Sequence, residues 1–370
     1  EKGFMLKGFN VWRKKQFVRL AAGMVACACG ISLMGCGAAG GAGKNSGSSG
    51  AGGAGNSGGA ANTAAVNSGD DYHAELKLAH IMPIDHPNGL GAEEFARLVK
   101  EKTDGHVTVS VFPASQLGNE KEIFDAVEIG SIDFAIIGFG EPAKKYQDIG
   151  ILDAPYIAGD REHLVRILNS DVVYSMFDEM EGHMGAKGIG AFYYGARYLT
   201  TKDKLVSDPE DMKGLNIRVP DQKLYIDTLT AMGAVATPMA FSEVFLSLQQ
   251  GVIDGQENPL ATIAANKFDQ VQHYLIKTEH IMGANALYAS TKTLESMPEA
   301  YRTAVLEAAR EASAWIDGKA FEAEDTYIEQ LEANGMEVIE DVDKEAFREM
   351  TAYIYDDFDQ ELVNKIRAVE

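Results

Sequence analysis

The stretch VTVSVFPASQLGNEKEIFDAVEIGSIDFAII, residues 107–137, decides the fold class. Valine occupies every second position of its first five residues, which is the period of a strand with one buried face. Ile123, Phe124 and Val127 follow at helical spacing. The apolar run 132–137 is typical of a strand buried in a parallel sheet. Strand, helix and strand in this order form the unit of an open α/β sheet.

The same alternation continues on both sides of this stretch. A short strand at 76–78 precedes it, and it leads into a helix whose buried face is predicted to hold Leu90, Phe95, Leu98 and Val99. Further strands are predicted at 189–193, 215–219, 234–237 and 252–256, with helices at 222–232 and 241–250. Two α/β halves fit this length of chain.

The chain changes character after Pro298. Residues 299–334 and 344–368 are rich in Ala, Glu and Leu and contain no proline, which predicts helices. A helix of roughly 35 residues would be about 50 Å long. Because one lobe is too small for it, the first of these helices is predicted to span both lobes or to bend near Gly318.

The charge of the 370 residues is distributed unevenly. The net charge is −22, but residues 1–69 carry seven Lys/Arg against one Glu, and residues 70–370 carry 26 Lys/Arg against 54 Asp/Glu, a net charge of −28. Contacts to phosphates need clustered cations. The acidic body therefore argues against nucleic acid or an anionic membrane as a binding partner.

Residues 1–35 are predicted to be a lipoprotein signal peptide. A basic stretch up to Arg19 precedes a mostly apolar run at 20–34, which fits a signal-peptide core and is short for a membrane-spanning helix. Leu33-Met34-Gly35-Cys36 resembles the bacterial lipobox, in which the signal is cut before a cysteine that receives lipid. The alternative is an ordinary signal peptide with a chance cysteine.

Residues 36–70 are predicted to be a flexible tether. They hold 12 of the 38 glycines and otherwise mostly Ala, Ser and Asn. A tether is useful where its far end is held, which favours lipid attachment at Cys36. Cys27 and Cys29 would leave with the signal, so the folded part has no thiol nucleophile, Cys–zinc site or disulfide. The protein is predicted to be exported and lipid-anchored, on the outer face of the cell membrane or in the periplasm.

The sequence contains no motif of a common enzyme or cofactor site. There is no Walker loop, His-Glu-x-x-His or Gly-x-Ser-x-Gly. His80 and His86 lie in a loop with two prolines, where structural hydrogen bonding is favoured over a metal pair or a general base. The acidic run 356–361 lacks calcium-loop spacing and fits a solvated helix face. No catalytic residue, metal or cofactor is predicted.

Two arginines each end an apolar strand-like run: Arg197 in YYGAR (193–197) and Arg218 in GLNIRVP (214–220). The ligand crevice of an open α/β sheet lies beyond the carboxyl ends of its strands, so both cations can face one cleft. The planar guanidinium matches a carboxylate with two parallel hydrogen bonds. From the pattern alone, a surface salt bridge is the alternative for either arginine.

Five segments together resemble a known family. KGLNIRVP (213–220), followed by GVIDGQENP (251–259), closely resembles the extracytoplasmic solute-binding proteins of TRAP transporters, the tripartite ATP-independent periplasmic systems. His86-Pro87, FPASQLG (112–118) and GARYLTT (195–201) agree in order and spacing. The resemblance implies a type II periplasmic-binding-protein-like fold with two lobes, each an open α/β sheet. It also implies closure on the ligand by hinge motion and delivery to TRAP permease subunits driven by an ion gradient.

The resemblance assigns roles to three residues. Arg218 corresponds to the arginine that makes the bidentate contact to the ligand carboxylate, and Arg197 to the second arginine of the family. Asn258 corresponds to an asparagine that commonly hydrogen-bonds ligand oxygen atoms. By analogy, residues 71–194 with 283–322 form lobe I, residues 195–282 with 323–370 form lobe II, and a long helix braces both.

The expected ligand is a small carboxylate, most of all a sugar acid such as a uronate or an aldonate. Residues 195–201 and 237–245 look most like members that carry these acids, and Gly138-Phe139-Gly140 disfavours sialic acid, because sialic-acid receptors place a polar and acidic pair there. Further candidate ligand-binding residues are Tyr194, His86, Gln116, Tyr193, Phe241 and His80. Core packing is an equal alternative for Tyr193 and Phe241.

Other functions stay open at this point. A C4-dicarboxylate is the alternative ligand, since Arg197 and Arg218 could each take one carboxylate. The same cleft could present its ligand to a sensor protein. An enzyme acting on a sugar acid with His86 as base is the remaining class, although the sequence offers neither a nucleophile nor a metal set.

Overall fold

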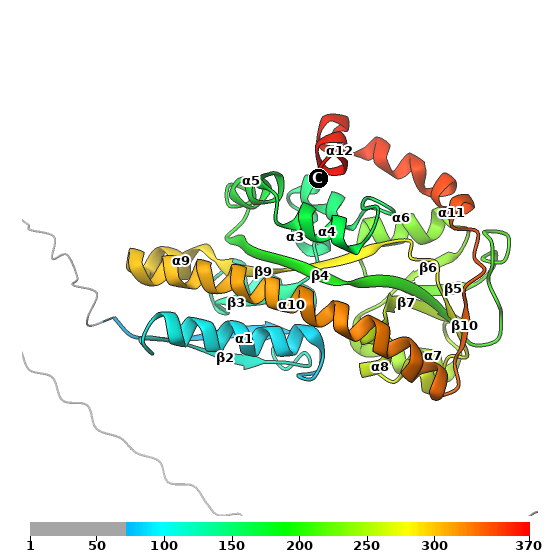
Figure 1. Ribbon diagram of the computed structural model, residues 1–370, viewed down its shortest axis with the longest axis horizontal. Helices are drawn as coiled ribbons and strands as arrows, with labels where there is room; N and C mark the ends of the chain where they lie inside the picture. Colours follow the sequence, from blue (N-terminus) through cyan, green and yellow to red (C-terminus); the bar gives the residue numbers. More distant parts are fainter. Residues whose placement is uncertain (1–71) are drawn as a thin grey trace, which may run out of the picture. The chain divides into compact units, whose positions relative to one another are not determined.

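The computed structural model describes residues 72–370. In this part of the chain ten strands form one sheet in the order β2-β1-β3-β9-β4-β7-β5-β6, with β8 paired to β4 and β10 paired to β8 (Figure 1). No helix among these residues is both long enough and apolar enough to cross a membrane. The predicted signal peptide, the tether and Cys36 lie outside the described residues.

The sheet has two halves that share β4. In the first half β1 pairs in parallel with β2 and β3, and β9 pairs antiparallel with β3 and with the first part of β4. In the second half the last part of β4 pairs antiparallel with β7 and β8, and β5 pairs in parallel with β6 and β7. The strands are β1 (Ala74–His80), β2 (Val107–Phe112), β3 (Phe134–Ile137), β4 (Ala186–Thr201), β5 (Asn216–Val219), β6 (Val235–Pro238), β7 (Gly255–Pro259), β8 (Tyr274–Ile276), β9 (Met282–Ser290) and β10 (Glu337–Ile339).

Strand β4 is 16 residues long, whereas the sequence predicted a strand only at 189–193. Its register against β9 shifts between Tyr193 and Gly195. Gly195 has a φ of 127°, which residues with a side chain rarely adopt, and a Cβ there would lie 2.6 Å from Cβ of Pro259. Glycine at this position lets one strand pass from the first half of the sheet into the second.

Helices flank the sheet, and α10 runs along it across the view (Figure 1). The α-helices are α1 (Pro87–Lys102), α2 (Glu120–Glu128), α3 (Gly140–Ala143), α4 (Arg161–Leu168), α5 (Asp171–Met180), α6 (Lys223–Ala231), α7 (Val244–Gln250), α8 (Leu260–Ala265), α9 (Thr291–Ser296), α10 (Glu299–Ala333), α11 (Lys344–Thr351) and α12 (Gln360–Arg367). The 3-10 helices are η2 (Gln147–Asp153), η3 (Phe241–Glu243), η4 (Phe268–Gln270) and η5 (Ala352–Asp357).

The long helix predicted after Pro298 is confirmed by α10, which continues through Gly318 for 35 residues. It packs against α1 and β4 and, further along, against α8 and β10. Helix α1 covers the first half of the sheet and α8 follows β7 of the second half. One helix therefore contacts elements of both halves.

Two local predictions were wrong. Leu90 is 41% exposed, while Phe95, Leu98 and Val99 are buried as predicted. Leu90 precedes Phe95 by five residues and so lies about 140° around the helix from it. Strand β7 begins at Gly255, three residues later than predicted, and Val252 is exposed.

The C-terminal segment packs against two different clusters of apolar side chains. Phe347 of α11 belongs to a cluster with Ile217 and Val219 of β5. Ile354 and Ile366 belong to a cluster with residues of β3, η2, α4 and α5. Residues 344–368 are mostly helical, as predicted, with a break before α12. The lobe boundaries drawn from the sequence stay a prediction.

We expect opposite effects on stability from two glycine-to-alanine substitutions that involve α10. A Cβ at Gly190 of β4 would lie 2.5 Å from Oγ of Ser313 and 3.0 Å from the carbonyl oxygen of Ala309, both in α10. Gly190→Ala should therefore lower the free energy of unfolding by about 1–3 kcal/mol. Gly318, inside α10, has no atom within 4 Å of its Cβ position. Gly318→Ala should raise the free energy of unfolding by up to about 1 kcal/mol.

Chemical denaturation of both variants measures these changes. A destabilising Gly318→Ala together with a neutral Gly190→Ala would contradict the close packing of α10 on β4.

Candidate ligand-binding site

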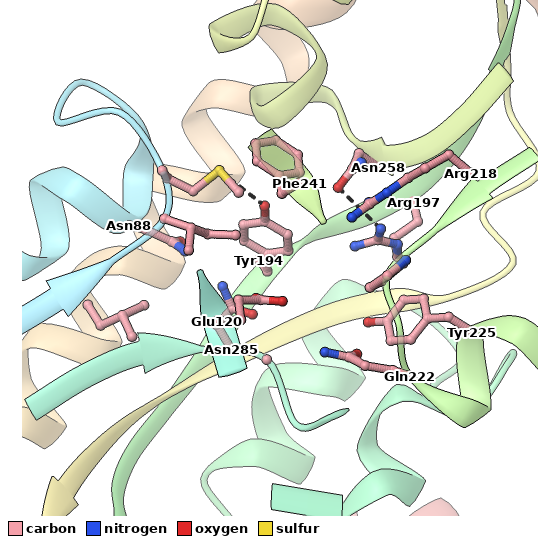
Figure 2. A pocket seen from close by; sticks show the side chains of 15 residues that line it. Asn88, Glu120, Tyr194, Arg197, Arg218, Gln222, Tyr225, Phe241, Asn258 and Asn285 are labelled. Atoms are coloured by element: carbon pink, nitrogen blue, oxygen red, sulfur yellow. Dashed lines mark hydrogen bonds between the residues drawn. The ribbon is translucent and has the colours of Figure 1, made fainter. Parts of the chain in front are cut away.

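A cavity lies where β4, β5 and β7 meet the N-terminal ends of α1 and α2 (Figure 2). Five of the nine predicted ligand-binding residues line it: Arg218, Arg197, Asn258, Tyr194 and Phe241. The arginines come from two strands that flank β7, Arg197 from β4 and Arg218 from β5. The sheet therefore brings together the two cations that the sequence singled out.

Arg197 is bound to a buried carboxylate. Its guanidinium pairs with Glu257 of β7 through Nε and Nη2, and Nη2 also donates to Oδ1 of Asn258 at 3.2 Å. His280 lies on the other side, with Nε2 3.2 Å from Oε2 of Glu257. Burial acts to lower the pKa of Arg197, but the charge of Glu257, its hydrogen bonds to Arg197 and the neighbouring Tyr225 together outweigh burial and raise the pKa. Burial acts in turn to raise the pKa of Glu257, and Arg197 and His280 lower it to about 2.

Arg218 has no such partner. It is 3% exposed and forms no ion pair within residues 72–370; Nε and Nη2 donate to the carbonyl oxygen of Met239 at 3.0 and 2.6 Å. Its Cζ lies 5.7 Å from the centre of the Phe241 ring. Burial lowers the pKa of Arg218 to about 10 and the positive charge of Arg197 adds to this, while the charges of Glu257 and Glu120 act in the opposite direction; Arg218 stays charged at neutral pH. A buried cation without a counter-ion is costly unless an anion joins it.

Tyr194 is held in place by a chain of hydrogen bonds. Nδ1 of His86 accepts from the backbone N–H of Asn88 and caps α1, so Nε2 carries the proton and faces Oγ1 of Thr262 at 3.3 Å. Thr262 Oγ1 lies 2.6 Å from the Tyr194 hydroxyl. His86 itself does not line the cavity, and burial lowers its pKa to about 3. It therefore acts on the site only by fixing Tyr194.

Three further predicted residues lie away from the cavity lining. His80 is fully buried in β1, and neither ring nitrogen has a hydrogen-bond partner in the described part of the chain. Gln116 is exposed in the loop before α2. The Tyr193 hydroxyl donates to Glu324 of α10 at 2.6 Å, and the ring is 1% exposed in the core. Tyr193 therefore packs in the core, which was the alternative to ligand binding that the sequence analysis left open for it.

Several cavity residues were not predicted from the sequence. Glu120 begins α2, directly after the segment FPASQLG and its cap Asn119, so its position after a strand end could have indicated it. Asn88 follows His86-Pro87 in the same way. Gln222 caps α6, Tyr225 lies in α6 and Asn285 in β9, and no local pattern marks these three residues. Burial and the charge of Glu141 raise the pKa of Glu120, while Arg218 and Arg197 act in the opposite direction.

A metal site is not formed by the described residues. Among residues 72–370 no group of three or more His, Cys, Asp or Glu side chains is arranged to hold a metal ion. The polar groups of the cavity are instead guanidinium, amide, phenol and carboxylate groups. Groups of these kinds are able to pair with an organic acid by hydrogen bonds and charge.

The chain is similar to solute-binding proteins of bacteria. Residues 78–361 match the family model "Bacterial extracellular solute-binding protein, family 7". Solute-binding protein RD1_1052 of Roseobacter denitrificans is 35% identical over 274 residues, which cover 74% of this chain and 83% of the relative. Its crystal structure, a TRAP periplasmic solute-binding protein with bound L-galactonate, has a TM-score of 0.75 at 32% identity and covers 80% of this chain and 99% of that one.

Two other relatives differ in the ligand that is named for them. A TRAP periplasmic solute-binding protein from Polaromonas sp. JS666, bound to D-erythronate, has a TM-score of 0.78 at 30% identity and covers 80% of this chain and 99% of that one. The C4-dicarboxylate-binding periplasmic protein of Rhodobacter capsulatus is 29% identical over 280 residues, 75% of this chain and 80% of the relative.

A buried carboxyl lies close to this site. Asp153 of η2 is 1% exposed, and neither of its carboxyl oxygens forms a hydrogen bond of good geometry within the described residues. Burial raises the pKa of Asp153 to about 7, although the charge of Arg197 acts to lower it. The folded protein therefore holds this carboxyl protonated up to a pH at which an unfolded chain has already released the proton.

We expect Asp153→Asn to stabilise the protein increasingly as the pH rises. Ionisation of Asp153 destabilises the folded state between the unfolded pKa near 4 and the folded value near 7, and asparagine removes this effect. The gain in unfolding free energy over the wild type should grow by about 2–3 kcal/mol from pH 5 to pH 8. Denaturation curves at both pH values measure it. Asp125→Asn, on the exposed face of α2, is the control and should show no such trend; an equal difference at pH 5 and pH 8 for Asp153→Asn would contradict the prediction.

Proposed function

The chain belongs to the bacterial extracellular solute-binding proteins, family 7, and we propose that its ligand is a sugar acid bound through Arg218. The two-lobed α/β fold predicted from the sequence is confirmed by the solved TRAP solute-binding proteins that it matches. The prediction of a receptor that is not an enzyme is confirmed by the family. A receptor of this kind works with the membrane permease subunits of a TRAP transporter.

The state of Arg218 is the observation that carries the proposal. Two of the five N–H donors of its guanidinium point at the Met239 carbonyl, which leaves one donor on Nη2 and both on Nη1. These form the end-on fork that matches the two oxygens of a carboxylate. A ligand carboxylate here would pair the buried charge and complete its hydrogen bonding.

Arg197 and Arg218 together are called the clamp below. The balance of charge around them favours a ligand with a single carboxylate. Arg197 is already neutralised by Glu257, so the two arginines and Glu257 together carry one net positive charge. One anionic group on the ligand balances this charge, and the carboxyl of Glu120 in the same cavity leaves no further positive charge for a second. A second would be left without compensation, and an uncompensated buried charge is strongly unfavourable.

Neutral polar groups next to the clamp favour a ligand that also carries hydroxyl groups. Asn258 uses one N–H on Gln256 and keeps another, and its carbonyl oxygen accepts from Arg197. Tyr194 also lines the cavity, with its hydroxyl held between Thr262 Oγ1 and Sδ of Met82. L-galactonate and D-erythronate, the ligands of two solved relatives, combine one carboxylate with several hydroxyl groups.

A C4-dicarboxylate is the second candidate. It is supported by the relative from Rhodobacter capsulatus and by the presence of two arginines in the lining of the cavity. The pairing of Arg197 with Glu257 weakens it, because the second arginine is not free to take the second carboxylate.

Lipid anchoring at Cys36 completes the proposed function. The lipobox-like segment 33–36 and the Gly-rich tether that follows would hold the receptor on the outer side of a membrane while leaving the cleft free to close. A held receptor stays close to the permease that it supplies.

We expect Arg218→Lys to lose most ligand binding. An ammonium cannot provide two parallel donors to one carboxylate, and losing one charge-assisted hydrogen bond costs about 1.5–3 kcal/mol. The affinity for L-galactonate, measured by calorimetry, should fall by at least about tenfold. Arg166→Lys, an exposed arginine of α4, is the matched control and should bind as the wild type does.

Two results would contradict this proposal in different ways. Near-native affinity of Arg218→Lys would refute the clamp. Absence of heat with L-galactonate, D-erythronate and D-glucuronate for the wild type would refute the sugar acid as ligand, and heat with succinate alone would favour the C4-dicarboxylate.

We expect Cys36→Ser to release the protein from the membrane. Serine has no thiol to receive lipid, so metabolic labelling with a radioactive fatty acid should be lost and the protein should move to the soluble extracellular or periplasmic fraction. Cys29→Ser is the matched control and should keep both the label and the membrane fraction. Unchanged labelling of Cys36→Ser would exclude the lipobox.

A further inference from the structure

The wall of the cavity that faces Arg218 carries three polar side chains and no cation. Among the described residues that line the cavity, the first half of the sheet and its helices contribute Asn88 from α1, Glu120 from α2 and Asn285 from β9, beside the apolar Ile81, Met82 and Ile136. Figure 2 shows the three polar side chains on one side of the cavity and the two arginines on the other. A ligand whose carboxylate meets Arg218 therefore points its other end at two amides and a carboxylate.

Asn88 has a buried side-chain amide whose oxygen accepts no hydrogen bond from the described part of the protein. It is 2% exposed, and its Oδ1 has no partner within the described residues. Its position is fixed, because its backbone N–H donates to Nδ1 of His86 at the start of α1. Leaving a buried amide oxygen unpaired costs about 1–3 kcal/mol, so an O–H group of a ligand would gain from meeting it.

Asn285 is the second such amide. It is 8% exposed and makes no side-chain hydrogen bond in the part of the chain that the structure describes. It lies opposite Phe192 in the pairing of β9 with β4. A Cβ at Gly138 would lie 3.5 Å from its Oδ1, so a larger residue at 138 would extend over the amide, and glycine leaves it open to the cavity.

Glu120 sets the sign of charge that this wall accepts. It begins α2 and makes no side-chain hydrogen bond within residues 72–370. Its carboxylate can accept from a hydroxyl group, whereas a second carboxylate of a ligand would be repelled by it. The amide oxygens and the Glu120 carboxylate can accept from hydroxyl groups of a ligand, whereas an anion would meet only the neutral N–H donors of the two amides and the repulsion of Glu120.

We propose that Asn88 and Asn285, with Glu120, form a subsite for the terminal hydroxyl groups of the ligand and select open-chain monocarboxylates over dicarboxylates of the same length. The proposal rests on the binding of an acid through Arg218 that is argued above. It adds that the end of the ligand opposite the carboxylate decides selectivity. It identifies the ligand class as aldonates, whose chain ends in a CH₂OH group.

Three acids with the same carbon skeleton test the subsite. L-galactonate has a terminal hydroxyl group, 6-deoxy-L-galactonate lacks it, and galactarate carries a carboxylate in its place. The wild type should bind the deoxy acid at least about tenfold and galactarate at least about thirtyfold more weakly than L-galactonate, because the first leaves the amides unpaired and the second meets Glu120.

Substitutions in the wall should change these ratios in a defined way. Asn88→Ala/Asn285→Ala should bind L-galactonate about tenfold more weakly but should no longer distinguish it from the deoxy acid. Glu120→Gln should narrow the gap between L-galactonate and galactarate at least about fivefold, since it removes the repulsion. Asn364→Ala, an exposed residue of α12, is the control and should keep the wild-type ratios. Circular dichroism and melting temperature establish that each variant is folded.

The outcomes separate the subsite from the clamp. If all three acids bind the wild type with equal affinity and Arg218→Lys binds none of them, the subsite is refuted and the carboxylate contact of Arg218 is supported. Unchanged ratios in Asn88→Ala/Asn285→Ala and Glu120→Gln would likewise refute the subsite. If none of the three acids binds, the binding of a sugar acid is refuted and the subsite with it. Variants that lose discrimination while staying folded would support the subsite.

Discussion

The ion pair between Arg197 and Glu257 is the interaction on which the site depends. Both side chains are almost completely buried, and the pair joins β4 to β7 inside the sheet. Removing one member would leave the other charge buried and unpaired, at a cost of about 3–5 kcal/mol. Because Arg197 is compensated in this way, Arg218 is the cation of the cavity that forms no ion pair among the described residues. The pair therefore sets how many negative charges a ligand can bring.

The position of this pair follows from the path of β4. The strand bends at Gly195, where its register against β9 shifts and a side chain would meet Pro259. Arg197 is placed two residues beyond the bend, where β4 leaves β9 and pairs with β7. Neighbouring residues of a strand face opposite sides, and Tyr193 and Tyr194 accordingly face α10 and the cavity. Packing of α10 and binding of ligand are thus divided between adjacent residues of one strand.

Local periodicity was enough to predict the first five elements and the long helix, because each of these depends on a pattern within one segment. It could not give the length of β4, or β8 and β9, since their antiparallel pairing joins segments far apart in the sequence. Arg197, Arg218 and Asn258 could be found from motifs, and Glu120 and Asn88 lie one or two residues beyond quoted motifs. Tyr225 and Asn285 could not be found, because only the fold brings α6 and β9 to the cavity. His86 carries a motif but supports Tyr194 through Thr262, a role that spacing does not reveal.

The net charge of −28 on residues 70–370 does not prevent this protein from holding an acid. Exposed charges are screened beyond about 8–10 Å at physiological salt, whereas Arg218 acts across a buried cavity in which the effective dielectric constant is low. The excess negative charge therefore slows the approach of an anion but has little weight once the anion is inside. Discrimination among acids must then come from groups within hydrogen-bonding distance. Since those groups include one free guanidinium, the amides of Asn88, Asn258 and Asn285, and one carboxylate, an acid with one charge and several hydroxyl groups is the ligand that leaves the fewest of them unpaired.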